Sequence, residues 1–127
     1  MKPQELRIGN TIMCQCRGEH KPYTIKSIWY NDEEKLYYVE LDNGFQCNIN
    51  GITPIPITDE LLLKCGFEQC GYLFKTLFIE MYEVTNGWHL HIDNERFETA
   101  LSITTKYVHQ LQNAYYLATD KELEIEL

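Results

Sequence analysis

The sequence contains two pairs of closely spaced residues whose side chains could bind a metal ion. One residue separates His89 from His91, and one separates Cys14 from Cys16. On an extended strand, side chains two residues apart lie on the same face, so each pair could present two ligands. A zinc site usually draws four ligands from two such pairs, and neither pair has a recognisable second half. We therefore expect no bound metal, and we interpret His89 and His91 as solvent-facing positions of a strand.

The five cysteines raise two further kinds of chemistry, disulfide bonding and nucleophilic catalysis. The count is odd and the first ten residues lack the apolar stretch of a signal peptide, so we expect thiols in a cytoplasmic protein. A cysteine nucleophile would need a histidine and an orienting group from distant segments. The apolar neighbours of Cys65 predict a helix core instead. No phosphate-binding loop, dinucleotide motif or nucleophile elbow is present, which predicts a protein that is not an enzyme and has no cofactor.

Aromatic residues are dense in the first third of the chain. Such residues on a small sheet can stack on the bases of single-stranded nucleic acid. The candidate aromatic surface consists of Trp29, Tyr30, Tyr37, Tyr38 and Phe45. Lys26 and Lys35 flank it. The competing interpretation is that these rings pack in the core.

The charged residues are unevenly distributed. The formal net charge is −8. Residues 1–57 hold six basic and seven acidic residues, whereas residues 58–127 hold five basic and twelve acidic ones. An acidic surface repels phosphate backbones, so we expect no binding to duplex DNA. The simpler explanation of the charge is that it keeps a small domain soluble.

The first 51 residues have the pattern of a small antiparallel sheet. Strand-like alternation over 11–14, 23–30, 36–41 and 45–49 predicts four strands. Between the last two, the run 42–44 (Asp-Asn-Gly) supplies the positive φ angles that a tight hairpin needs. Four strands within about fifty residues predict a strongly bent, SH3-like sheet.

Two prolines then interrupt the strand pattern. Pro54 and Pro56 lack a backbone donor, so residues 52–57 cannot form a central strand, and we expect a rigid connector. Thr58 has the side chain of a helix N-cap, and Gly66 is typical of the position after a helix end. A helix of about eight residues is predicted between them.

Further strands are predicted from four runs, at 72–74, 77–84, 88–92 and around 96–100. Asn86 and Gly87 are a strong hairpin signal between the second and third of these runs. In the third run, the residues on either side of the two histidines are apolar. They are expected to face the core.

The pattern changes to helical spacing from about Thr105, which is a plausible cap. The apolar face of this helix consists of Val108, Leu111, Tyr115 and Ala118. The opposite side, with Gln110, Gln112 and Asn113, is expected to be solvated. Together with His109 it is an alternative candidate for a protein contact face.

The last six residues alternate between acidic and apolar side chains. This alternation predicts a strand that packs Leu123, Ile125 and Leu127 on one face and leaves the other face in water. The candidate acidic contact surface is that wet face, with Glu122, Glu124 and Glu126.

These elements predict an α+β fold in a single compact domain over residues 1–127. Its N-terminal β-subdomain, residues 1–51, is the SH3-like antiparallel sheet. The α+β portion, residues 58–127, holds the short helix, a second antiparallel hairpin sheet, the C-terminal helix and the final strand.

Several segments taken together resemble a family of small uncharacterised proteins of bacterial phages, prophages and mobile elements. These segments are residues 5–10, 52–58, 62–67, 108–113 and 122–125. The resemblance implies no known activity or active site. The family usually has a glycine in the turn after its last helix, where this chain has Asp120.

The sequence leads to two competing hypotheses about function. The first is a non-catalytic binding protein of a phage or mobile element, which contacts a protein partner such as a basic host or defence nuclease and inhibits it. The alternative is a single-stranded nucleic-acid-binding module that uses the N-terminal aromatic sheet.

Overall fold

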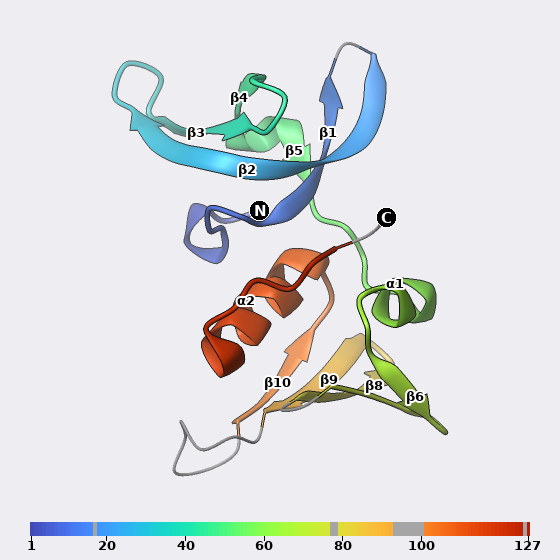
Figure 1. Ribbon diagram of the computed structural model, residues 1–127. Helices are drawn as coiled ribbons and strands as arrows, with labels where there is room; N and C mark the ends of the chain where they lie inside the picture. The colour runs from blue at the N-terminus through green and yellow to red at the C-terminus, as the bar shows by residue number, and fades with distance from the viewer. Residues whose placement is uncertain (17, 77–78, 93–100, 126) are drawn as a thin grey trace. The chain divides into compact units, whose positions relative to one another are not determined.

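A computed structural model describes residues 1–16, 18–76, 79–92, 101–125 and 127 (Figure 1). The chain divides into two compact units, Met1–Ile55 and Pro56–Leu127. The boundary falls inside the proline-containing connector that the sequence predicts at 52–57. Each unit has a hydrophobic core of its own. Among the described residues, no helix has the length and apolar character needed to cross a membrane.

The first unit is one antiparallel sheet with two short 3-10 turns. Its strands are β1 (Thr11–Cys16), β2 (Glu19–Asn31), β3 (Leu36–Leu41), β4 (Gln46–Asn48) and β5 (Ile52–Thr53). The turns are η1 (Pro3–Glu5) and η2 (Ile49–Gly51). In the sheet the order is β4-β3-β2-β1-β5. The small antiparallel sheet is therefore confirmed, while its likeness to SH3 domains stays a prediction.

The long strand β2 pairs with two neighbouring strands. Its first half pairs with β1 and its second half with β3, and the register to β3 shifts between Ile25 and Ser27. Such a shift bends a strand and increases its twist. The bent strand places Ile25 in the core with Ile12 and Val39. The sheet therefore curls around its own core.

The predicted hairpin after β3 is confirmed. Gly44 has a φ of 88°, in the left-handed region that glycine tolerates best, and its N–H donates to the Leu41 carbonyl at 2.9 Å. The first two residues of the predicted connector form β5, which pairs only with β1 at the edge of the sheet. An edge position fits the prediction that the segment could not form a central strand.

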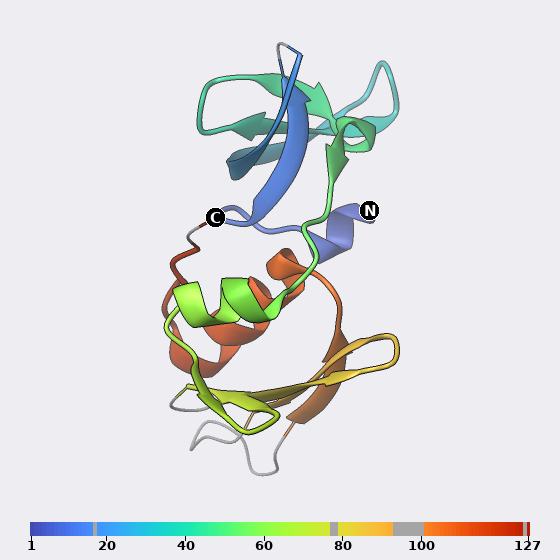
Figure 2. The same cartoon turned by 90° about the vertical axis from the view of Figure 1, so that its right-hand side faces the viewer.

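The second unit is an antiparallel meander covered by two helices. Its strands are β6 (Glu68–Cys70), β7 (Leu73–Lys75), β8 (Ile79–Val84), β9 (Gly87–Ile92) and β10 (Leu101–Thr105). Their order in the sheet is β10-β9-β8-β7-β6. The helices are α1 (Asp59–Lys64) and α2 (Val108–Thr119). Figures 1 and 2 show both helices on the same side of this sheet, and Leu62, Leu111 and Leu90 belong to one buried core.

Helix α1 begins and ends as its sequence predicts. The Thr58 side chain accepts a hydrogen bond from the N–H of Leu61 at 3.2 Å, and Gly66, after the helix, has a φ of 93°. The strands predicted at 72–74, 77–84 and 88–92 correspond to β7, β8 and β9, while β6 is an additional strand. Residues 77–78 and the strand predicted around 96–100 lie outside the described residues.

The start of helix α2 differs from the prediction. Thr105 is not its cap, because it belongs to β10 and is only 2% exposed. The N-cap is Tyr107, and the Gln110 side chain accepts hydrogen bonds from the N–H groups of Lys106 and Tyr107 at 2.9 and 3.1 Å. The predicted polar face is also wrong in part, because His109 and Gln112 are buried. Gln112 lies one helical turn after Val108, so it borders the apolar stripe and lies close to the core.

The predicted final strand is wrong for the described residues. After α2, Asp120 has a φ of 59°, the left-handed conformation that glycine adopts most easily. Residues 122–125 then follow without strand pairing. Leu123 nevertheless lies in the core at 6% exposure, whereas Leu127 is 54% exposed. An extended segment can bury alternate side chains without pairing its backbone, so the alternation indicated burial and not a strand.

Candidate functional site

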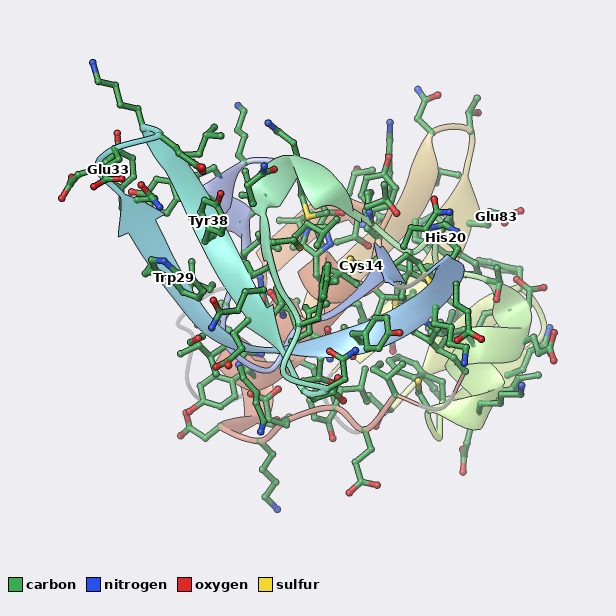
Figure 3. All side chains as sticks on the ribbon, turned by 90° about the horizontal axis from the view of Figure 1, so that it is seen from above. Cys14, His20, Trp29, Glu33, Tyr38 and Glu83 are labelled. Carbon is green, nitrogen blue, oxygen red and sulfur yellow. The ribbon has the colours of Figure 1, made fainter. Side chains whose placement is uncertain are left out.

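The candidate aromatic surface is divided between the two faces of the β2–β3 hairpin. Trp29 pairs with Tyr38 across the strands, and their rings are stacked, with centroids 5.8 Å apart and an interplanar angle of 24°. Both side chains are half-buried. Figure 3 shows them on neighbouring strands of this hairpin. We refer to them as the Trp29–Tyr38 pair.

The other aromatic residues lie elsewhere. Tyr30 pairs with Tyr37, and their exposed rings meet edge to face at 5.0 Å. Because side chains alternate along a strand, this pair lies on the face opposite Trp29 and Tyr38. Phe45 packs against the core of the unit. The predicted aromatic surface is therefore not one continuous stacking platform.

Carboxylates lie next to the Trp29–Tyr38 pair. The Tyr38 hydroxyl donates a hydrogen bond to the Glu34 carboxylate, and this bond raises the pKa of Tyr38 above its ordinary value. Ser27 pairs with Glu40 across the strands and its hydroxyl donates to that carboxylate at 3.4 Å. Ser27 lies two residues from Trp29, and Glu40 lies two residues from Tyr38, so all four share a face. Negative charge here opposes phosphate and favours a cationic ligand.

The histidine pair lies on the outer face of the second sheet. His89 and His91 are half-buried, while the apolar residues between and beside them are buried in the core. The predicted alternation of this strand is thus confirmed. The His89 ring lies 5.0 Å from the Tyr82 ring, its neighbour on β8. Within the described ranges, no three His, Cys, Asp or Glu side chains are grouped as a metal site requires.

The cysteines fall into different environments. Cys14 is buried, and its sulfur lies 3.9 Å from the Cys47 sulfur. The side chain of Cys16 lies outside those that the structure describes, so the Cys14 and Cys16 spacing is not tested as a ligand pair. Cys65 packs against the core of the second unit, as the sequence predicts, and Cys70 is exposed.

The described carboxylates of the second unit all point to solvent. They are Asp59, Glu60, Glu68, Glu80, Glu83, Asp120, Glu122 and Glu124. The described lysines of the unit are also exposed, and they are Lys64, Lys75, Lys106 and Lys121. Two of the three predicted contact residues, Glu122 and Glu124, are therefore accessible. Glu126 lies outside the described residues.

An open cleft of about 790 Å³ lies beside the β8–β9 hairpin of the second unit. Its walls include Glu83, Trp88, Lys106 and Tyr107. The Trp88 indole N–H donates to the carbonyl of Ile57 at 3.2 Å, which ties the start of the unit to β9. Sequence reasoning missed this cleft, because segments far apart in the chain form it. Only the Asn86 and Gly87 hairpin signal pointed to one of its walls.

Comparison with known proteins places no relative beside this chain, since no family model, no curated protein and no solved structure matches it.

Proposed function

We propose that this chain is a non-catalytic binding protein that contacts a basic protein partner through the exposed carboxylates of its second unit. The observation that carries the proposal is the accessibility of those charges. Eight described carboxylates face water in this unit against four described lysines. Burying carboxylates is costly for a fold, so these groups stay accessible at the surface.

A surface of this kind acts at long range. Its negative field speeds the encounter with a positive surface and opposes the approach of phosphate. The resemblance to proteins of phages and mobile elements suggests one kind of partner, a host or defence nuclease in the cytoplasm. The basic groove with which a nuclease holds nucleic acid would fit this charge, and occupying it would inhibit the enzyme.

The test compares capture of partner proteins by the native chain and by a charge-reversed variant carrying Glu122→Lys and Glu124→Lys. Glu33→Lys, an exposed reversal in the first unit, is the matched control. We expect a basic protein that the native chain and the control capture at about 150 mM salt and that the double variant loses. The proposal would be contradicted if the amount of captured protein depended neither on salt nor on the double reversal. Tight binding of duplex DNA by the native chain would also contradict it.

A second candidate function, binding of single-stranded nucleic acid, has one observation in its favour, the stacked Trp29–Tyr38 pair. Of the two tryptophans, Trp88 is buried and Trp29 is half-exposed, so quenching of tryptophan fluorescence by an added ligand reports mainly on Trp29. Because of the neighbouring carboxylates, we expect oligonucleotides to cause no quenching at about 150 mM salt. Quenching that Tyr38→Ala abolishes would favour this second function over the first.

A further inference from the structure

Two thiols of the first unit lie close enough to react with each other. The sulfur atoms of Cys14 and Cys47 are 3.9 Å apart, although 33 positions separate them in the sequence. Cys14 belongs to β1 and Cys47 to β4, which are not neighbours in the sheet. The contact exists because the sheet curls and brings the inner sides of these two strands together. Figure 3 shows Cys14 within the curled sheet.

The two sulfur atoms differ in accessibility. Cys14 is 2% exposed in the core, whereas Cys47 is half-buried at the border of that core. A dissolved oxidant therefore reaches Cys47 first. Cys14 is then held beside it as the thiol that resolves the oxidised product.

A glycine lies beside the more accessible of the two cysteines. A disulfide needs a bond of about 2.05 Å, so the pair must close by roughly 1.9 Å from its present contact. Gly51 lies beside Cys47, and a Cβ atom built on it would lie 3.5 Å from the Cys47 sulfur, in ordinary contact. With no side chain at this position, Cys47 has space to change its rotamer.

We infer that Cys14 and Cys47 form an oxidation site, at which a peroxide converts the two thiols into an intramolecular disulfide that joins β1 to β4. In the first step the Cys47 thiolate attacks one peroxide oxygen and the O–O bond breaks, which gives a sulfenic acid and hydroxide. The hydroxide takes up the proton that the Cys47 thiol had released and becomes water. In the second step the Cys14 sulfur attacks the sulfenic sulfur and displaces hydroxide, which leaves as water with the Cys14 proton. Two thiols lose two electrons, and hydrogen peroxide accepts them and becomes two water molecules.

The disulfide would close a loop that runs from β1 through the β2–β3 hairpin to β4. A cross-link over such a span restricts the unfolded chain, so the oxidised protein should melt at a higher temperature. In a reducing compartment the pair remains as thiols, in agreement with the sequence-based expectation of no structural disulfide. The site thus responds to oxidative challenge and reverses when a thiol reductant is supplied.

The test treats the native full-length chain with hydrogen peroxide, blocks the remaining thiols, and maps cross-linked peptides by mass spectrometry without reduction. We expect a cross-link between Cys14 and Cys47 that dithiothreitol removes, with an increased melting temperature. Cys47→Ser should abolish this cross-link, whereas Cys70→Ser, at an exposed cysteine of the second unit, should retain it.

Three outcomes would overturn the inference. They are a cross-link that maps to another pair such as one with Cys16, overoxidation of Cys47 without any cross-link, and a cross-link that forms only after denaturation. Because the mapping uses the native chain, the result does not depend on whether a variant at the buried Cys14 folds.

Discussion

Among single residues, Tyr38 has a pKa that its surroundings raise. The hydrogen bond to Glu34 is the largest cause, followed by partial desolvation and the charge of that carboxylate. All three favour the protonated hydroxyl. The folded state therefore holds the Tyr38 proton more tightly than the unfolded state, for which the ordinary pKa is about 10.

The first prediction follows from this hydrogen bond. Glu34→Gln removes the charged acceptor, so the pKa of Tyr38 should fall toward its ordinary value. The stabilisation from this contact is fully present below pH of about 10 and is lost as the pH rises through the folded pKa of Tyr38. NMR titration of tyrosines labelled in the ring, assigned with Tyr38→Phe, measures this pKa. Glu33→Gln is the control, and an unchanged Tyr38 pKa in Glu34→Gln would show that the carboxylate is not the cause.

Gly87 carries the second prediction. Its φ is 139°, and a Cβ atom built on it would lie 2.5 Å from the carbonyl oxygen of Thr105 on β10. Gly87→Ala therefore combines backbone strain with a clash against backbone, and it should lower the free energy of unfolding by at least about 2 kcal/mol. Denaturant unfolding measures the change. Gly51→Ala is the matched control, because its Cβ would make only ordinary contacts; equal stability of the two variants would contradict the clash.

Local backbone requirements at single residues were predictable, whereas burial outside the regular apolar pattern was not. Thr58, Gly66 and Gly44 act through hydrogen bonds and φ angles within a few positions of themselves, and the sequence shows those positions directly. His109 is 0% exposed although it lies opposite the predicted apolar stripe. What covers it comes from elsewhere in the fold, and helical spacing alone does not contain that information.

At the level of elements, the segment after α2 gives the third prediction. Leu123 is buried in the core while Leu127 is exposed, although both belong to the same alternating run. Leu123→Ala should therefore lower the free energy of unfolding by about 2–5 kcal/mol, and Leu127→Ala should change it by less than about 0.5 kcal/mol. Denaturant unfolding of the two variants checks this. Similar losses in both would mean that the whole run packs against the fold as the alternation first suggested.

Elements with their own turn signals were the ones the sequence predicted well. The strands β3 and β9 lie next to hairpin signals and alternate clearly, and their predicted bounds agree with the structure to within one residue. Strand β6 consists of three exposed residues without apolar alternation, and only its pairing with β7 makes it a strand. The final segment failed for the opposite reason, since it alternates without a pairing partner.

At the scale of the whole molecule, the contacts that bring distant segments together could not be predicted from the sequence. The change from one compact unit to the next, between Ile55 and Pro56, falls within the connector predicted at 52–57. The contact between Cys14 and Cys47 joins residues 33 positions apart, and the cleft beside the β8–β9 hairpin joins three separate segments, at 56–57, 83–88 and 106–107. The cysteine contact depends on how the first sheet curls, and the cleft depends on how distant segments return to the second sheet. No local sequence pattern predicts such contacts.

The last prediction concerns the electric field of the molecule. With a formal net charge of −8, most of it from residues after position 57, the chain should associate with immobilised poly-lysine at a rate that falls as salt rises from about 50 to 300 mM. The double variant Glu122→Lys and Glu124→Lys should associate more slowly at low salt. Its free energy of unfolding should stay within about 0.5 kcal/mol of the native value, because both side chains are exposed.

Surface plasmon resonance measures the association rates, and denaturant unfolding shows whether the double variant keeps its stability. Glu33→Lys reverses an exposed charge in the first unit and separates the effect of position from that of net charge. If only total charge matters, one reversal at position 33 should cause about half the slowing of the double variant. A larger share for Glu122 and Glu124 would indicate that the field is concentrated on the second unit. An association rate that does not change with salt concentration would contradict the electrostatic basis of the proposed function.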